Sequence, residues 1–375
     1  MTETLARTPL YDWHAAHGGR LVDFAGWSMP VQYSSIAAEH TAVRTAAGLF
    51  DVSHMGRLRF DGRAGDGSDT GAFLDSLLTR RTADMQTGQV RYSLVTNEAG
   101  GILDDVLAYR LQNAAGGGYH LMVVNASNRA KIVDWLTPRL RDFPDVRMTD
   151  VTLDWAMIAV QGPLARELVA PLVEAPLDKM KYYQCVETRI AGHGGIVSRT
   201  GYTGEDGWEL IVGGRAVIGI WEQILAAGAE RGVMACGLGC RDTLRLEAAM
   251  PLYGHELSEA INPFQAGLNF AVNLEGREFP GRAAIAPLKD DPRLERRVGL
   301  RFDGKRVPRE GYPVVDGSQT IGRVTSGTFS PTFNCPLAMA YVDAEHAAID
   351  RELGVDVRGK VEPCRVVPLP FYRRS

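Results

Sequence analysis

A short apolar segment that contains two adjacent acids constrains the fold more than any other part of this chain. Residues 102–109 are apolar except for Asp104 and Asp105, and a glycine pair precedes them at 100–101. Glycine adopts positive φ at no steric cost, so the pair predicts a tight turn. An apolar run of this length after a turn predicts a strand that is buried on both faces.

The two acids should face opposite sides of the expected sheet, because side chains alternate along a strand. Asp105 shares its face with Tyr109, four residues later, and Asp104 does not. An unpaired carboxylate among hydrocarbon side chains costs several kcal/mol or takes up a proton. A chain keeps this arrangement for a structural ion pair or cap, or for work on a cationic or proton-bearing ligand. The pattern alone leaves both roles open.

The composition is that of an ordinary globular protein. Of the 375 residues, 45% are apolar and 23% are charged, and the net charge is −4. This length predicts two or three domains, and this charge offers no electrostatic footprint for nucleic acid. No apolar stretch is long enough to span a bilayer, and residues 1–7 show no hydrophobic segment of a secretory signal. The five cysteines are odd in number and scattered, as expected of reduced thiols in the cytoplasm.

Metal-binding and nucleotide-binding motifs are not found in the sequence. Cys236 and Cys240 can share a helix face, but no further His or Cys pair stands nearby to complete a zinc site. His54 is the only histidine inside a dense motif, and a structural role is favoured for it over that of a catalytic base. No Gly-x-Gly-x-x-Gly sequence follows an expected strand, and no Gly-Lys-Ser loop occurs. We expect neither a metal nor a dinucleotide.

Helical and strand-like segments are mixed along the first 276 residues without a strict βαβ rhythm, which favours an α+β fold. The expected helices cover residues 10–16, 36–47, 70–78, 127–140, 164–173, 216–227 and 241–250. The expected strands cover residues 57–60, 89–96, 102–111, 119–124, 155–161, 185–190 and 207–212.

The composition changes near residue 277, where a charged, proline-bearing segment begins. Short strands between Gly, Pro and Asp turns follow, and they predict a small all-β barrel or sandwich. We therefore divide the chain into 1–276, a region of two α+β domains of which the first can be discontinuous in sequence, a connecting segment 277–296, and a C-terminal barrel domain 297–375. The expected barrel strands cover residues 298–302, 312–315, 320–326, 338–342 and 359–367.

Two further motifs place charged groups in apolar surroundings. Glu209 interrupts an expected strand after a turn-rich loop, where its carboxylate can accept two N–H donors or can lie in water on a half-exposed strand. Arg241 and Arg245 lie one helical turn apart on the same face. Arginine offers a flat fork for carboxylates or planar rings, and an intrahelical salt bridge is the alternative.

These motifs resemble those of a known family. The sequence resembles the T-protein of the glycine cleavage system, an aminomethyltransferase that uses tetrahydrofolate. The resemblance covers nearly the whole length and rests on several long motifs in the right order. The motifs lie at residues 8–11, 26–33, 50–55, 97–105, 199–209, 237–247, 325–331 and 370–372.

The resemblance implies a cloverleaf of three domains around a central channel, with a small C-terminal β-barrel. Folate would enter this channel with its pterin innermost. The second acid of the Asp-Asp pair is catalytic in the family, which assigns that role to Asp105. The matching glutamate and arginine hold the folate, which assigns those roles to Glu209 and Arg241. The tyrosines that line the site correspond to Tyr92, Tyr109, Tyr202, Tyr182 and, in the C-terminal tail, Tyr372.

The implied substrate is an aminomethyl group on the lipoyl arm of a carrier, the H-protein. Ammonia leaves, and the one-carbon unit passes to tetrahydrofolate to give methylene-tetrahydrofolate and the dihydrolipoyl carrier. A carboxylate in a dry pocket suits the positive charge and the protons of this reaction, so we predict an electrostatic role for Asp105 and a structural one for Asp104. The arginine-rich stretch 293–301 is a candidate docking surface for the carrier, although a solvated charge run is favoured.

Two alternatives remain open from the sequence. One is a tetrahydrofolate-dependent demethylase of the same fold, and the other is a non-enzymatic folate-binding regulator. The intact motifs at 97–105 and 201–207 favour the glycine system over the first, and the retained Asp105 disfavours the second.

Overall fold

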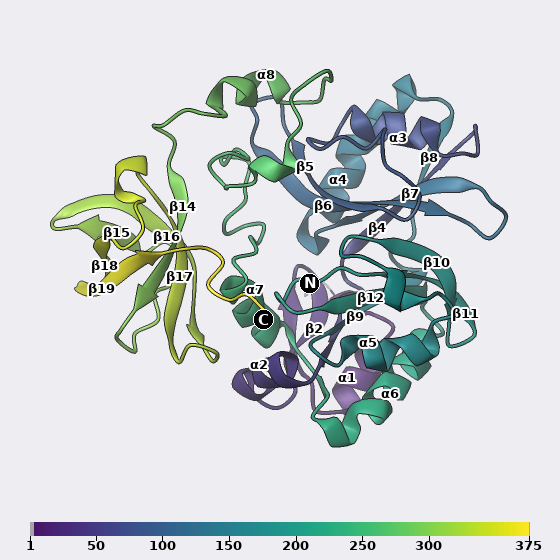
Figure 1. Cartoon of the computed structure of the whole chain (residues 1–375), viewed down its shortest axis with the longest axis horizontal. Helices are drawn as coiled ribbons and strands as arrows, with labels where there is room; N and C mark the ends of the chain where they lie inside the picture. The colour runs from purple at the N-terminus through teal and green to yellow at the C-terminus, as the bar shows by residue number, and fades with distance from the viewer. Residues whose placement is uncertain (1–3, 375) are drawn as a thin grey trace. The chain divides into compact units, whose positions relative to one another are not determined.

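The computed structural model describes residues 4–374 and is drawn in Figure 1. The first three residues of the N-terminal segment, examined above for a signal sequence, therefore lie outside the described residues. The chain forms two compact units. Unit 1 comprises Met1–Ser93, Asp105–Gly201 and Glu205–Arg241, and unit 2 comprises Leu94–Asp104, Tyr202–Gly204 and Asp242–Ser375. Within the described part of the chain, no helix is both long and apolar enough to cross a membrane.

Unit 1 contains most of a five-stranded sheet with the order β5-β6-β7-β4-β8. The two-acid segment lies in β6, which is buried along most of its length, as predicted. The preceding turn also has the predicted form, because Gly100 adopts a φ of +84°. Helix α3 (Ser68–Asp75) packs on β4, β7 and β8. The strands of this sheet are β4 (Gly56–Gly62), β5 (Val90–Thr96), β6 (Ile102–Gln112), β7 (Gly118–Val124) and β8 (Val146–Asp150).

A second sheet of unit 1 has six strands in the order β10-β11-β12-β9-β3-β13. Its apolar face packs against α1, α5 and α6, whose buried side chains include Trp221. The strands are β3 (Gly48–Asp51), β9 (Trp155–Gln161), β10 (Cys185–Ile190), β11 (His193–Ser198), β12 (Gly207–Gly213) and β13 (Met234–Ala235). The other helices and strands of unit 1 are α1 (Tyr11–Ala16), β1 (Arg20–Phe24), β2 (Trp27–Gln32), α2 (Ile36–Thr45), α4 (Arg129–Leu136), α5 (Ala165–Val169) and α6 (Val217–Gly228).

A buried hydrogen-bond cluster joins the N-terminal segment to β3. The Asp51 carboxylate accepts a hydrogen bond from the Thr8 hydroxyl at 2.6 Å and contacts His14 Nε2 at 2.9 Å. The other ring nitrogen of His14 contacts the Tyr33 hydroxyl at 2.7 Å. Burial alone would raise the pKa of Asp51, but its hydrogen bonds with His14, Ser53 and Thr8 hold that pKa below its ordinary value. Each polar group of the cluster is thus satisfied, as a structural role requires.

Unit 2 contains a closed β-barrel, as the sequence predicts, with the strand order β14-β17-β16-β15-β18-β19. Its interior is filled by aliphatic side chains around Phe302. The strands are β14 (Arg296–Phe302), β15 (Pro313–Asp316), β16 (Gln319–Ser330), β17 (Cys335–Val342), β18 (Glu352–Val357) and β19 (Lys360–Val367). Helix α8 (Arg282–Ile285) precedes the barrel, and α7 (Leu238–Glu247) passes from unit 1 into unit 2 after Arg241.

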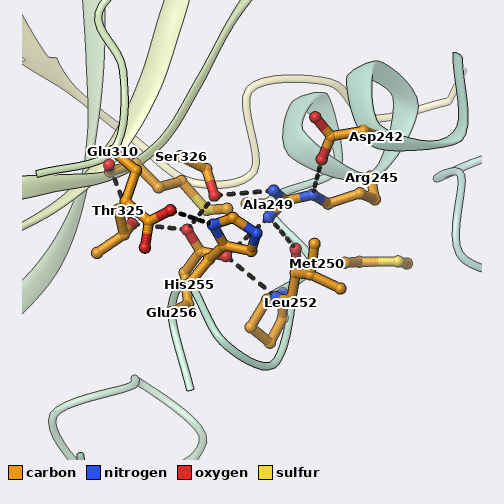
Figure 2. A network of polar contacts seen from close by, with 12 residues as sticks. Asp242, Arg245, Ala249, Met250, Leu252, His255, Glu256, Glu310, Thr325 and Ser326 are labelled. Carbon is orange, nitrogen blue, oxygen red and sulfur yellow. Dashed lines mark hydrogen bonds and ion pairs between the residues drawn. The ribbon is translucent and has the colours of Figure 1, made fainter. Parts of the chain in front are cut away.

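A buried ion pair attaches α7 to the barrel within unit 2 (Figure 2). Arg245 Nη1 donates to Glu256 Oε2 at 2.7 Å, and the two side chains are at most 2% exposed. The other Glu256 oxygen accepts hydrogen bonds of 2.6 Å from Thr325 and Ser326, at a bulge of β16. Burial alone would raise the pKa of Glu256, but Arg245 and these donors hold it below its ordinary value. The intrahelical salt bridge that the sequence left open for Arg245 is also formed, because Arg245 Nε donates to Asp242 Oδ1 at 2.8 Å, whereas Glu256 lies beyond the end of α7.

Several expected elements differ from the structure, mainly where proline interrupts a helical pattern. The helix expected at 127–140 becomes 3-10 turns on both sides of α4, the second with Pro138 in its first turn. The helix expected at 164–173 ends at Val169, before Pro171. Helix α7 both begins and ends earlier in the sequence than expected. Beyond its end, Ala249 has a φ of +53°. The strands that were not predicted from the sequence are β1, β2, β3, β8, β11, β13 and β18.

Replacing Glu256 with alanine should destabilise the protein by about 3–5 kcal/mol, because Arg245 would remain buried without its counter-charge. Asp242→Ala is the matched control: it removes a 2.8 Å partner of the same arginine whose side chain is 48% exposed, and it should cost less than about 1 kcal/mol. Denaturant unfolding measures both free energies. Equal losses in the two variants would contradict the assigned role of the buried pair.

Candidate active site

The Asp105 carboxylate is held by two side chains from the strands on each side of it. Asn125, which directly follows β7, donates from Nδ2 to Asp105 Oδ1 at 2.7 Å. The Tyr92 hydroxyl, from β5, donates to Asp105 Oδ2 at 3.1 Å. Asp104 is fully buried, whereas Asp105 keeps part of its surface exposed. The structure therefore gives the two acids different surroundings, and Asp105 is the less buried of the two.

Burial dominates the electrostatics of Asp105. Desolvation raises its pKa from 3.8 to about 6, although the hydrogen bonds from Asn125 and Tyr92 act in the opposite direction. Two neutral donors offset only part of the cost of removing a carboxylate from water. The group is thus mainly ionised at neutral pH and can still take up a proton near that pH, as a general acid–base or charge-stabilising group requires.

Glu209 lies at the centre of a second buried polar cluster, on β12. Its side chain is almost completely buried, and its Oε2 accepts a short hydrogen bond from the Thr200 hydroxyl. Thr200 uses its proton in that bond, so Ser198 must donate to the Thr200 oxygen across their 2.8 Å contact. Within residues 4–374, the other Glu209 oxygen accepts no hydrogen bond. Glu209 thus presents one engaged oxygen and one available oxygen.

The charge of Glu209 is only partly compensated. Burial raises its pKa, while the Thr200 hydrogen bond and the nearby Arg241 charge lower it. The Tyr109 phenol lies in the same surroundings, and burial, followed by the Glu209 charge, raises its pKa well above 10. The Tyr109 hydroxyl is buried and has no hydrogen-bond partner among the described residues. A buried donor without a partner is costly, and beside the Glu209 carboxylate it indicates a site for a polar ligand.

Arg241 lies near Glu209 and two aromatic rings. Its guanidinium is 5.9 Å from the centre of the Phe50 ring, and its charge also acts on His54. Burial is the main cause that lowers the pKa of His54 to about 4, with the charges of Arg241 and Arg57 adding to it. His54 is therefore neutral at physiological pH. Its ring packs edge-on against Phe24 with 5.4 Å between centres, as the favoured structural role requires.

The remaining predicted tyrosines belong to different units of the chain. Tyr182 belongs to unit 1, is 41% exposed, and packs edge-on against Tyr183 with 4.6 Å between ring centres. Tyr183 is the more buried of the two and is close enough to Glu209 for its pKa to be affected. Tyr202 and Tyr372 belong to unit 2. There the Tyr202 hydroxyl donates to the Pro251 carbonyl at 2.5 Å, and the Tyr372 N–H donates to the Glu247 carbonyl at 2.8 Å.

Comparison with known protein families identifies the family to which this chain belongs. Residues 10–276 match the family model of the GCVT N-terminal domain, and residues 295–373 match that of the glycine cleavage T-protein C-terminal barrel domain. The chain belongs to the glycine cleavage T-protein family.

Relatives in this family are similar to the chain over almost its whole length. An aminomethyltransferase of Streptomyces coelicolor is 46% identical over 99% of this chain and 98% of its own, and one of Symbiobacterium thermophilum is 44% identical over 100% and 99%. A crystal structure of the glycine cleavage system aminomethyltransferase T from Bartonella henselae matches with a TM-score of 0.88 and 33% identity, and the match covers 98% of each chain. The chain is accordingly an enzyme, an aminomethyltransferase of glycine cleavage. These likenesses favour the transferase over the demethylase and the regulator.

Several residues around the two carboxylates of the candidate site were not predicted from the sequence. Asn125, Thr200 and Ser198 bind or orient these carboxylates, and Tyr183 lies beside Tyr182. Asn125 could have been found, because it is the first polar residue after the apolar strand at 119–124. Thr200 could not, because its bond to Glu209 depends on how the loop between them folds back.

One group of side chains in the described residues has the proximity of metal ligands. The ligand atoms of Glu39, Cys236 and Cys240 all lie within 4.8 Å of one another. Both Glu39 oxygens already accept backbone N–H bonds, from Tyr33 and Ser34 on one side and from Gly237 on the other. Burial raises the pKa of Cys236 well above 9, which favours the thiol over the thiolate that metals bind. These contacts identify Glu39 as a buried cap for two chain segments.

The raised pKa of Asp105 predicts a pH-dependent cost to stability. Between pH about 4 and 6 the folded state binds the proton of the Asp105 carboxyl more tightly than the unfolded chain does. The stability that this proton contributes is therefore lost as the pH rises through about 6. Asp105→Asn removes that cost. The free energy of unfolding of the variant, relative to that of the parent, should therefore rise by about 1–3 kcal/mol when the pH is raised from 5 to 7.5. Urea unfolding at both pH values measures this, and a difference that does not change with pH would refute the assigned pKa.

Proposed function

We propose that this T-protein takes its aminomethyl group from the lipoyl arm of the H-protein and passes the one-carbon unit to tetrahydrofolate. Tetrahydrofolate, when bound, would supply the two nitrogens that accept this carbon. The residues fit such a ligand: among residues 4–374 the buried Tyr109 hydroxyl has no hydrogen-bond partner of good geometry, and one oxygen of the buried Glu209 accepts no hydrogen bond. The observation that carries the proposal is the Asp105 carboxylate, which Asn125 and Tyr92 hold within reach of a ligand.

In this proposal Asp105 stabilises positive charge and handles protons. Departure of the amine leaves positive charge on the carbon, and a partly desolvated carboxylate attracts that charge more strongly than one in water. Its pKa of about 6 also allows it to hold and release a proton near neutral pH. Asn125 and Tyr92 fix the direction of the two carboxylate oxygens, so that the charge is preorganised before substrate arrives.

Glu209, Tyr109 and Arg241 would hold the pterin in this proposal. A pterin ring presents adjacent N–H donors and a carbonyl on one edge, which suit a carboxylate oxygen and a hydroxyl donor. Thr200 keeps Glu209 from rotating, because it occupies Oε2. Arg241 compensates part of the Glu209 charge and offers a planar face for stacking. We assign supporting roles at this ligand to Tyr182, Tyr202 and Tyr372 from the family resemblance.

We also propose a division of the chain at 276 and 297 and a location in the cytoplasm. All five cysteines are unpaired thiols, which is typical of a reducing compartment. The arginines at 293–301 support the carrier-docking surface only weakly. Arg293 is paired with Asp291 at 2.8 Å, and Arg296 and Arg297 donate to backbone carbonyls of this chain. These groups are already engaged within the protein, as expected of a structural or solvated charge run.

The decisive assay supplies H-protein loaded with the aminomethyl group, together with tetrahydrofolate, and follows the release of ammonia and of methylene-tetrahydrofolate. Asp105→Asn preserves shape but removes the charge, so turnover should fall by about two orders of magnitude or more while folate affinity changes little. Circular dichroism confirms that the variant is folded. A folded Asp105→Asn enzyme that keeps most of its turnover would remove Asp105 from the mechanism.

Replacing Glu209 with glutamine should weaken tetrahydrofolate binding about ten- to a hundredfold, because a charged acceptor becomes a neutral amide with a donor in the wrong place. Titration calorimetry measures the dissociation constant. Glu222→Gln, an exposed acid on α6, is the control and should leave binding unchanged. If Glu209→Gln binds tetrahydrofolate as tightly as the parent does, Glu209 does not hold the pterin.

A further inference from the structure

Gln161 is a completely buried amide at the end of the central strand β9. Its backbone pairs with Gly207 of β12 on one side and with Gly48 of β3 on the other. Its side chain donates from Nε2 to the Thr200 carbonyl at 3.2 Å. A buried amide is costly unless its polar atoms are used. This side chain therefore holds the loop 199–206, which connects β11 to β12.

Two glycines leave room for the Gln161 amide. A Cβ atom at Gly201 would overlap the amide oxygen, and a Cβ atom at Gly207 would overlap the amide nitrogen. A side chain at either position would therefore displace the amide, because atoms that are not bonded to each other need about 3.5 Å or more. The amide thus lies between the backbone near the end of β11 and the backbone at the start of β12.

An ion pair and a backbone hydrogen bond close the same loop. The Arg199 guanidinium donates to both carboxylate oxygens of Asp206, at 2.9 and 2.8 Å. The N–H of Gly162, the residue after Gln161, donates to the Asp206 carbonyl at 2.8 Å. Thr200, which follows Arg199 and is bound by the Gln161 amide, is therefore fixed in its backbone.

The Thr200 hydroxyl transmits this constraint to Glu209. Ser198 lies directly opposite Glu209 in the β11–β12 register, so the two side chains share one face of the sheet. The Thr200 hydroxyl is 2.8 Å from the Ser198 hydroxyl and donates a short hydrogen bond to Glu209 Oε2. All three residues are at most 4% exposed. A hydroxyl that donates its only proton to a carboxylate favours the ionised form of that carboxylate.

We propose that Gln161 is a positioning residue for tetrahydrofolate binding, which acts through Thr200 on the carboxylate of Glu209. This inference rests on the proposed function, in which that carboxylate holds the pterin. Gln161 fixes the backbone of Thr200, and the Thr200 hydroxyl fixes one oxygen of Glu209. Without the amide, the hydroxyl is no longer held toward the carboxylate. The carboxylate then takes up a proton more readily, and a protonated carboxyl binds the N–H groups of a ligand less tightly.

The other groups that act on Glu209 keep their charge in the pH range of a binding experiment. Burial raises the pKa of Glu209, and besides Thr200 the charge of Arg241 lowers it. Arginine remains charged throughout this range. Burial is the main cause that raises the pKa of the Tyr109 and Tyr183 phenols above 10, so both stay neutral. A change in the pH dependence of binding therefore reports on Glu209 and its hydrogen bonds.

The test measures the dissociation constant of tetrahydrofolate by titration calorimetry over a range of about pH 5 to 9. Thr200→Val removes the hydroxyl but keeps the shape. The pH below which binding weakens should rise by about 1–2 units, as expected for the loss of a hydrogen bond to a charged acceptor. Thr200→Ser keeps a hydroxyl and should restore the parent's pH profile. The titrations of the ligand and of Asp105 are common to the parent and the variants, so they cancel in the comparison.

Gln161→Met keeps the length of the side chain and removes the amide. It should raise the same pH midpoint by about 0.5–1 unit, although the carboxylate and both hydroxyls remain in place. Gln161→Asn, whose amide is too short to reach the Thr200 carbonyl, should behave in the same way, and it carries the test if the first variant does not fold. A parent-like pH profile in a folded variant of Gln161 overturns the inference.

The double variant Gln161→Met/Thr200→Val decides whether Gln161 acts through Thr200. It should have the pH midpoint of Thr200→Val alone, because the hydroxyl on which the amide acts is absent. Shifts that add up in the double variant also overturn the inference, since the two residues would then act independently.

Thr82→Val is the matched control for Thr200→Val. Thr82 is a buried threonine of the same unit, and its hydroxyl donates to the Gly71 carbonyl at 3.1 Å. Its replacement removes a buried hydroxyl away from Glu209 and should leave the pH profile of binding unchanged. If the parent binds tetrahydrofolate and the variants of Gln161 match it, the inference is wrong while the proposed function stands. If the parent does not bind tetrahydrofolate, the proposed function itself fails.

Discussion

The candidate site depends on the Asp105 carboxylate, because its hydrogen bonds offset only part of the cost of its burial. Asp105 lies on a strand that is buried along most of its length and receives only two side-chain hydrogen bonds, from Asn125 and Tyr92. Burial outweighs these donors and raises the pKa to about 6. A fully paired carboxylate would be more stable and less able to act, whereas one in water would attract charge only weakly. In the function that we propose, this position between the two limits suits Asp105 to one-carbon transfer.

The same comparison separates structural from functional acids elsewhere in the chain. Glu256 is buried but has an arginine, two hydroxyls and a backbone N–H as partners, and its pKa lies below the ordinary value. Glu209 is also buried but has one hydroxyl partner, and its pKa lies above the ordinary value. Burial is common to both, so the number and charge of the partners decide the outcome. The acid with many partners, Glu256, holds the fold together, and we propose that the acid with few, Glu209, keeps an oxygen for a ligand.

Much of this could be predicted from the sequence, for reasons that particular residues make clear. The glycine pair and the apolar run fixed the turn and strand of Asp105, because both signals are local. The C-terminal barrel followed from short strands between turns. Strand β1 of the hairpin β1–β2 was missed, because its residues are partly or fully exposed. Strand β18 was missed although Leu353, Val355 and Val357 alternate with polar residues, which is a strand signal. The Thr200–Glu209 bond could not be predicted, since it requires knowing how a loop returns to its own strand. The positive φ of Tyr183 could not be predicted either, because it depends on the contacts that hold this backbone.

The central claim is that an ionised oxygen of Asp105 faces the nitrogens of tetrahydrofolate that accept the carbon. A crystal structure of the complex with tetrahydrofolate tests it most directly. The account predicts the Asp105 carboxylate within hydrogen-bonding or one-water reach of those nitrogens, still bound by Asn125 and Tyr92. A complex in which that carboxylate points into bulk solvent, away from the ligand, would contradict it.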